Sequence, residues 1–181
     1  NLIKVMSELE FYPNISPREM IQEGVFGGAY FGPNAGPVIS IEQKKLIKEL
    51  FYDMDKDLYM AEKYLPRRNK FKIRSGMPYE YWLKMNWLDK RDPYGWFEWY
   101  CKYSIGQRVK DDNRQIRRWQ KFTGRNGRWR NNIYKKIHYS NNWNISPRVQ
   151  QSLLHWGYTI NREDYSLWCM MNNRVKNEKE G

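Results

Sequence analysis

The sequence predicts a mainly α-helical fold: a compact multi-helix domain with an irregular, glycine-rich amino-terminal part. Three observations support this class. No stretch shows the sustained alternation of apolar and polar residues that half-buried strands require. Several segments begin with helix-capping residues, and glycine and proline concentrate in residues 24–37, which is typical of a loop. We therefore expect a single domain over residues 1–181, with a loop-rich part over 1–76 and a helical part over 77–181.

Capping residues mark the first two expected helices. Ser16-Pro17-Arg18-Glu19 combines a serine cap, a proline at the first helical position and a glutamate that completes a capping box, so a helix is predicted to about Gln22. Gly24 would end this helix. Ser40-Ile41-Glu42-Gln43 repeats the box and predicts a helix to about Phe51.

Five further helices are expected in the second half of the chain, where Pro, Asp and Ser stand at helix starts and Gly near helix ends. Their approximate ranges are 92–105, 111–123, 127–139, 146–157 and 163–176. Only Gly28–Phe31 and Lys70–Arg74 are strand candidates, so we expect at most a small strand pair.

The composition excludes several classes of protein. Aromatic residues make up 17% of the chain, whereas disordered segments are poor in aromatic residues. No apolar run approaches the roughly 20 residues that a membrane-spanning helix needs, and two cysteines cannot form a disulfide framework. Because no apolar leader is visible either, we expect a soluble intracellular protein, cytoplasmic or nuclear, with no membrane partner.

The positive charge is concentrated in one segment. Residues 101–140 hold twelve Lys and Arg against two Asp, a net charge of +10 out of +12 for the whole chain. Such clustering is typical of proteins that bind polyanions. The alternative is a solvated face that keeps the protein soluble.

The expected helix over 111–123 has an amphipathic pattern that presents arginines outward. Ile116, Trp119 and Phe122 form an apolar stripe, and the glycine-containing turn Thr123–Gly127 leads into a second basic helix. Phosphate contacts are expected along this segment, and a DNA-reading helix-turn-helix is a narrower alternative. The predicted nucleic-acid-binding residues are Arg114, Arg117, Arg118, Lys121, Arg125, Arg128, Arg130, Lys135 and Lys136.

An aromatic block occupies residues 79–103. Trp96, Phe97 and Tyr100 lie at helical spacing, which predicts core positions. Nucleic-acid-binding proteins also use aromatic rings to stack on bases. Three residues are the candidates for exposed stacking rings: Trp82, Tyr94 and Trp99.

The glycine-rich segment over residues 24–32 is predicted to be a tight loop packed by Tyr30 and Phe31. It lacks the Lys-Ser/Thr pair of a nucleotide-binding P-loop. A cradle for a ligand or for another backbone is the alternative, with Gly27, Gly28 and Tyr30 as its contact residues.

Neither a metal site nor a cofactor site is expected, because the two histidines and two cysteines lack zinc-site spacing. No nucleophile and base pair is evident, so whether the protein is an enzyme stays open. Acidic residues near the basic segment are weak candidates for a catalytic acid or base: Asp92, Glu98, Asp111 and Asp112.

Two central motifs resemble an uncharacterised protein family found in phages of aquatic bacteria, in algae and in fungi. They are Asp92-Pro93-Tyr94-Gly95-Trp96-Phe97-Glu98-Trp99-Tyr100-Cys101 and Asp111-Asp112-Asn113-Arg114-Gln115-Ile116-Arg117-Arg118-Trp119. The resemblance extends over about residues 14–160 and includes Phe26–Phe31 and Ser146–Gln150. The family usually has Thr and a basic residue where this chain has Ala29 and Gly32. The resemblance implies no activity, but it implies that the loop, the aromatic helix and the arginine row form one unit.

Three functions are compatible with these features. The first is a nucleic-acid-binding protein that holds the phosphates of DNA or RNA through residues 102–136, with aromatic rings stacking on bases. The second is an enzyme that excises or modifies nucleic-acid bases or acts on nucleotides. The third is a phage structural protein or a host-interaction protein whose basic segment meets an acidic protein partner. The sequence favours the first.

Overall fold

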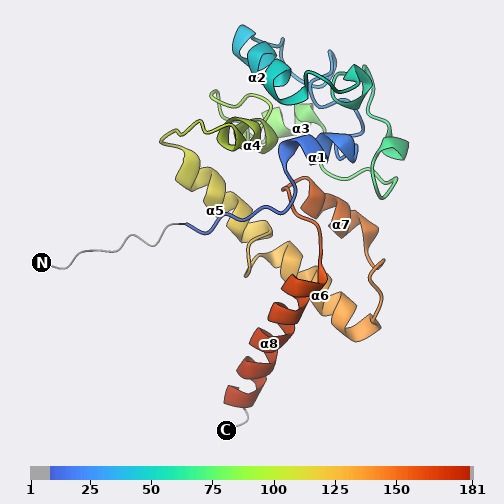
Figure 1. Cartoon of the computed structure of the whole chain (residues 1–181), viewed down its shortest axis with the longest axis vertical. Coiled ribbons are helices and arrows are strands. Elements are labelled where there is room, and N and C mark those ends of the chain that lie inside the picture. The colour runs from blue at the N-terminus through green and yellow to red at the C-terminus, as the bar shows by residue number, and fades with distance from the viewer. Residues whose placement is uncertain (1–8, 180–181) are drawn as a thin grey trace, which may run out of the picture.

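The computed structural model describes the backbone of residues 9–179 and the side chains of residues 9–173. Within this range the chain forms eight α-helices, two short 3-10 helices and no strand (Figure 1). The mainly helical class is therefore confirmed. The α-helices are α1 (Pro17–Gln22), α2 (Ile41–Phe51), α3 (Tyr79–Lys84), α4 (Trp96–Ser104), α5 (Asp112–Phe122), α6 (Arg128–Ser140), α7 (Pro147–Leu154) and α8 (Arg162–Lys179), and the 3-10 helices are Lys56–Leu58 and Pro66–Arg68.

The amino-terminal helices begin where the sequence predicts. In α1 the Ser16 hydroxyl accepts from the Glu19 backbone N–H, and the Glu19 carboxylate accepts from the Ser16 backbone N–H. The same reciprocal pair joins Ser40 and Gln43 at the start of α2. These caps satisfy amide groups that would otherwise lack partners, so both helices are specified locally.

The helix predicted to start at Asp92-Pro93 begins later, at Trp96, and this prediction was wrong. Gly95 is the cap residue with a φ of +90°, a conformation that favours glycine. Its N–H donates to the Asp92 carbonyl, so residues 92–95 form a turn. The short helix α3 was not predicted, because its cap is Pro78 and no side chain caps its start.

Neither strand candidate forms a strand in the part of the chain that the structure describes, which agrees with the prediction of at most a small strand pair. The loop does pair with another segment: the Phe31 N–H donates to the Tyr59 carbonyl, and the Ala61 N–H donates to the Gly28 carbonyl. Lys70–Arg74 turns back on itself, with a φ of +54° at Lys72, and the Asn69 side chain bonds to both backbone groups of Ile73. Backbone turns therefore replace the predicted strands.

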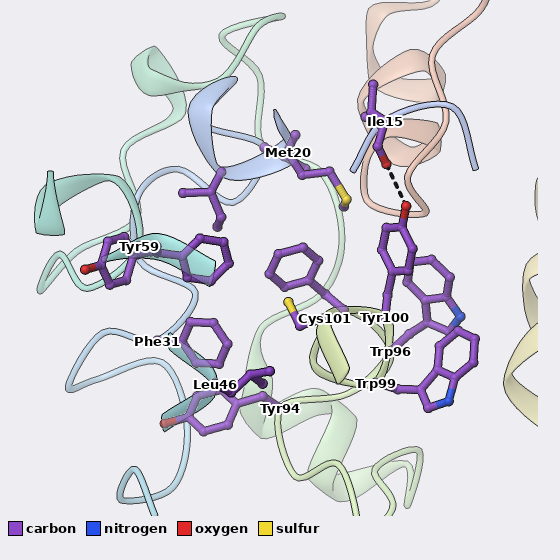
Figure 2. Packing of buried hydrophobic residues seen from close by; sticks show 14 of the residues in the cluster. Ile15, Met20, Phe31, Leu46, Tyr59, Tyr94, Trp96, Trp99, Tyr100 and Cys101 are labelled. Carbon is purple, nitrogen blue, oxygen red and sulfur yellow. Dashed lines mark hydrogen bonds between the residues drawn. The ribbon is translucent and has the colours of Figure 1, made fainter. Parts of the chain in front are cut away.

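The larger hydrophobic core joins α1, α2, α4 and the glycine-rich loop (Figure 2). Trp96, Phe97 and Tyr100 are buried in it, so their predicted core positions are confirmed. Phe11, from the segment before α1, touches several rings of α4 and α5, with ring centroids between 5.2 and 6.2 Å apart. The Tyr100 hydroxyl donates to the Ile15 carbonyl at 2.9 Å. This core fixes α4 and the base of α5.

A smaller core lies between α6, α7 and the start of α8. Ile133, Ile137 and Leu153 are buried there, while the neighbouring Leu154 belongs to the larger core. Helix α8 extends away from the rest of the molecule (Figure 1). No helix in the described range is both long enough and apolar enough to cross a membrane.

Candidate nucleic-acid interface

Helix α5 anchors the basic segment to the larger core. Its inner face buries Gln115, Ile116 and Trp119, and the Trp119 indole N–H donates to the Trp156 carbonyl at 2.8 Å. The basic side chains occupy the remaining surface, as the amphipathic pattern predicts. The structure divides these cations into two groups, one engaged with carboxylates and one open to solvent.

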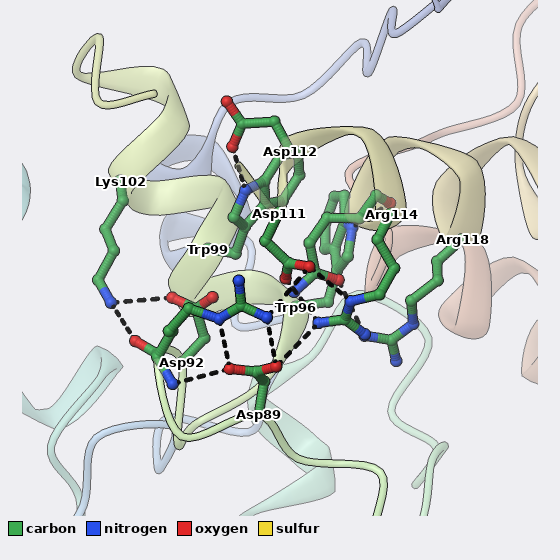
Figure 3. Close-up of polar contacts among 11 residues, drawn as sticks. Asp89, Asp92, Trp96, Trp99, Lys102, Asp111, Asp112, Arg114 and Arg118 are labelled. Carbon is green, nitrogen blue, oxygen red and sulfur yellow. Dashed lines mark hydrogen bonds and ion pairs between the residues drawn. The ribbon is translucent and has the colours of Figure 1, made fainter. Parts of the chain in front are cut away.

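The first group surrounds the start of α5 (Figure 3). Arg114 holds the Asp111 carboxylate with two bonds of 2.7 and 2.6 Å, and it lies 3.5 Å from Asp89. Arg91 binds the Asp89 carboxylate with two bonds of 2.7 Å and lies 3.2 Å from Asp111. Asp111 and Asp89 thus neutralise both arginines, and the Arg91 bonds hold the pKa of Asp89 well below its usual range.

A second set of ion pairs lies beside the first, at the start of α4. The Lys102 ammonium is 2.8 Å from Asp92 and 3.1 Å from Glu98. Glu98 is buried, and it also accepts from the Gln43 amide at 3.0 Å and from the Tyr94 N–H at 2.9 Å. Burial raises the pKa of Asp92, while the Lys102 bond opposes that rise. Glu98 therefore closes the turn before α4 and ties that turn to α2.

The four weak catalytic candidates are engaged in structural contacts. Asp92, Glu98 and Asp111 are buried in the ion pairs above. Asp112 accepts from the Trp99 indole N–H at 2.9 Å and from the Val109 N–H at 3.1 Å. None of the four lines the cavities of about 280, 570 and 170 Å³ that the described residues form. Their contacts favour structural roles over general acid or base catalysis.

Two other predicted binding residues are partly withdrawn from solvent. The Arg118 guanidinium donates to the Gln115 amide oxygen at 2.9 Å and lies over the Trp156 ring, and burial lowers its pKa. Arg130 forms an ion pair with Asp164 at 2.9 Å, with 11% of its side chain exposed. Both residues hold helices together and contribute less free charge than the sequence indicates.

The second group of cations lines an open cleft of about 570 Å³ at the junction of α5 and α6. Arg117, Lys121 and Arg125 all line it and are exposed, and none forms an ion pair among the described side chains. The carboxylates in the wall are Glu10, which is exposed, and Asp164, which is already held by Arg130. The cleft therefore offers three uncompensated cations to an anion.

Backbone packing shapes this cleft. The turn between the helices is so tight that a Cβ at Gly127 would lie 2.5 Å from backbone atoms of Phe122 and Thr123. On the other side, the Gln120 amide donates to the Glu10 carbonyl at 2.9 Å and places the amino-terminal segment along α5. Tyr12, two residues after Glu10, lines the cleft with 72% of its surface exposed. Sequence analysis missed Tyr12, because only the tertiary fold brings it beside the basic helix.

Apart from Arg130, which lines the cleft, the predicted cations of α6 lie outside it. Arg128 covers the Phe122 ring at 4.4 Å from its centroid, and Lys136 donates to the Ser146 hydroxyl at 2.9 Å. Lys135 is exposed. Because Arg128 and Lys135 are seven residues apart, they lie on the same side of α6, about two turns from one another.

The predicted stacking residues do not form an exposed platform. Tyr94 and Trp99 are 3% and 1% exposed, so the expectation of exposed rings was wrong for both. Trp99 is covered by Phe11 and Tyr103, which the sequence spacing could not show. Trp82 is half-buried and lines a second cavity together with Tyr30 and Tyr94.

The glycines of the loop face protein atoms. A Cβ at Gly27 would lie 2.6 Å from the Tyr64 ring, and one at Gly28 would lie 2.5 Å from the Asp57 carbonyl oxygen and from Arg68. These contacts suit a tight loop, in which the backbone at Gly27 and Gly28 is covered by another part of the same chain. Tyr30 is the one predicted loop contact that reaches a cavity.

In the described residues, no three His, Cys, Asp or Glu side chains converge in a way that could hold a metal ion. Comparison of the chain with protein-family models, curated proteins and solved structures finds no match. The resemblance to phage, algal and fungal proteins thus stays a prediction from the two motifs.

Proposed function

We propose that the protein binds the phosphate backbone of DNA or RNA through the cleft between α5 and α6. The supporting observation is that Arg117, Lys121 and Arg125 line one cleft without an ion-pair partner among the described residues. Arginine and lysine donors directed at one opening suit a chain of phosphates. Glu10 partly offsets their charge, and a net positive potential remains.

Tyr12 supports a nucleic acid over a free anion. Its ring is exposed at the wall of the same cleft, where it can stack on a base while the cations hold neighbouring phosphates. Arg128 and Lys135 on the outer face of α6 are available to continue the contact along the strand.

A charge-matched pair of triple variants tests this function. We expect R117Q/K121Q/R125Q to weaken binding to DNA and RNA, measured by fluorescence anisotropy at a series of salt concentrations. The loss of three phosphate contacts should reduce the slope of log K against log salt by about 2 to 3. The control K44Q/K45Q/K48Q removes the same charge from exposed lysines of α2.

The control variant should keep the affinity and the salt slope of the unaltered protein. Equal losses in the two triple variants would show that net charge, and not the cleft, drives binding. Absence of binding to any nucleic acid at low salt, with an acidic protein co-purifying, would shift the function to a protein partner.

A further inference from the structure

A second cavity, of about 280 Å³, lies between the glycine-rich loop, α3 and the end of α7. Its walls come from five segments that are distant in the sequence, and it shares no lining residue with the cationic cleft. Its volume is at the lower end for small-molecule sites, which suits a ligand of one ring system. The ring-bearing wall residues are Phe26, Tyr30, Tyr64, Tyr79, Trp82 and Tyr94.

Three of these tyrosines have hydroxyls that are engaged with the protein. The Tyr30 hydroxyl donates to the Tyr94 carbonyl, the Tyr94 hydroxyl donates to the Pro37 carbonyl, and the Tyr64 hydroxyl accepts from the Asn69 amide. The Tyr30 and Tyr94 hydroxyls are thus directed at backbone carbonyls, and these tyrosines present their carbon rings to the cavity. A cavity with ring surfaces on several sides favours a flat apolar or aromatic ligand.

His155, at the end of α7, supplies an uncharged hydrogen-bonding group to the wall of the cavity. His155 Nε2 lies 3.2 Å from the Val25 carbonyl and 3.5 Å from the Gln151 amide nitrogen. Because a carbonyl only accepts, and Gln151 already donates to the same carbonyl at 2.8 Å, we assign the ring proton to Nε2. This tautomer leaves Nδ1 as an acceptor with no partner among the described residues. Burial lowers the pKa of His155 to about 4, which keeps the ring uncharged at neutral pH. Gly76 leaves room beside this edge, because a Cβ there would lie only 3.4 Å from Nδ1 and Cε1.

The wall contains charged side chains of both signs, Arg74 together with Glu62 and Glu80. The Arg74 guanidinium already lies over the Tyr64 ring, 5.0 Å from its centroid, so a second cation in the ring cage would be repelled. Glu62 and Glu80 also line the cavity and are exposed, so they disfavour a free anion. The interior therefore suits an uncharged ring.

We propose that this cavity binds a single uncharged heteroaromatic ring of the nucleobase type, held between the aromatic walls and hydrogen-bonded to His155 Nδ1. The inference deepens the proposed function and rests on it, since an unstacked base of the bound strand is one source of such a ring. A free nucleoside is the other source. An exocyclic amino group, as in adenine, guanine or cytosine, is the donor that complements Nδ1.

The test places a large side chain at the edge of the cavity, so that it occupies the space of the ligand. We expect saturation-transfer NMR to detect binding of adenosine, guanosine or cytidine, and A35W to weaken it by about tenfold or more, as expected for lost stacking. Ala35 lines the cavity. The control V38W puts the same ring in the same loop at a position that is 95% exposed, and it should bind like the unaltered protein.

A second variant keeps the test valid if A35W unfolds. Y79L removes one half-buried ring from the wall and should also weaken nucleoside binding, with folding verified by thermal denaturation. Unchanged binding in both folded variants would overturn the inference. Binding of tetramethylammonium without binding of any nucleoside would also overturn it, because that result describes a cation cage.

Further experiments distinguish a base of a bound strand from a free nucleoside as the ligand, and the cavity proposal from the cleft proposal. If the ring comes from a bound strand, A35W should weaken binding of single-stranded oligonucleotides but not of the same oligonucleotides with abasic sites; if it is free, only nucleoside binding should fall. The cleft variant R117Q/K121Q/R125Q should keep nucleoside binding. If the protein binds nucleic acid but no nucleoside, and A35W has no effect, the proposal for the cavity is overturned and the proposed function is kept. If the unaltered protein binds neither nucleic acid nor nucleosides, both proposals are overturned.

Discussion

The two ends of the basic segment contain similar residues but have opposite electrostatic character. At the start of α5, Arg114 shares Asp111 and Asp89 with Arg91. One to two turns further along α5, Arg117 and Lys121 face an open cleft without an ion-pair partner among the described residues. Charge counted along a sequence is therefore not the charge available to a ligand. The fold pairs carboxylates with the arginine at one end of α5, whereas at the other end Asp164 is held by Arg130 and Arg117 and Lys121 form no ion pair among the described residues.

The largest expected effect on the free energy of unfolding comes from removing a carboxylate of the ion-pair network beside the start of α5. Glu98→Ala removes a buried carboxylate. Lys102 keeps Asp92 as its one ion-pair partner and the Arg91 carbonyl as an acceptor, whereas the Gln43 amide and the Tyr94 N–H lose their acceptor. Breaking a buried ion pair typically costs about 3 to 5 kcal/mol, and urea denaturation measures it. Asp53→Ala removes an exposed ion pair with Arg18 and should change the free energy of unfolding little. Similar losses in the two variants would contradict a structural role for Glu98.

Lowering the pH should weaken the ion pairs of Asp89 at the start of α5, and it should do so gradually. Because Arg91 lowers the folded-state pKa of Asp89, its stabilisation is complete above the unfolded pKa of about 4 and is lost as pH falls below that value. Hydrogen bonds to charged groups contribute about 1.5 to 3 kcal/mol, so Asp89→Asn should lose that amount at neutral pH.

Denaturation at several pH values measures this effect. The difference between Asp89→Asn and the unaltered protein should shrink below about pH 4. Asp92 acts in the opposite direction, because its raised pKa means that protonation relieves a buried charge. A difference that is constant down to the lowest pH would show that the Asp89 charge does not stabilise the fold.

The smallest expected effect on stability comes from replacing single arginines of α5. Arg114→Gln and Arg117→Gln should each change the free energy of unfolding by less than about 1 kcal/mol, since both side chains are substantially exposed. Their effects on nucleic-acid binding should differ. Arg117→Gln should lower the salt slope by about one, whereas Arg114→Gln should leave it nearly unchanged because Asp111 and Asp89 already neutralise Arg114. Equal slopes would remove the distinction between the two ends.

Local sequence signals predicted much of the helical fold. The capping boxes at Ser16 and Ser40 act within four residues, so no tertiary information was needed to find them. The delayed start of α4 was missed because Asp92-Pro93 is also a strong helix-start signal. The turn that replaces it depends on the positive φ of Gly95 and on Glu98, which is bonded to Gln43 in a distant helix.

The candidate site was only partly predictable, for the same reason. The positions of Arg117, Lys121 and Arg125 follow from helical spacing and from the glycine turn. The neutralisation of Arg114 by Asp89 and the cover that Phe11 places over Trp99 depend on contacts between distant segments. Tyr12 reaches the cleft through the path of a segment that carries no motif.

The adjacent leucines of α7 have a consequence for how the molecule unfolds. Leu153 is packed in the smaller core and Leu154 in the larger one, so the same helical turn contributes to both. Loss of either core removes the packing that holds this turn, and the other core loses a wall. The two cores should therefore melt in one cooperative transition, and the helices on both sides of α7 should share similar opening free energies in hydrogen exchange.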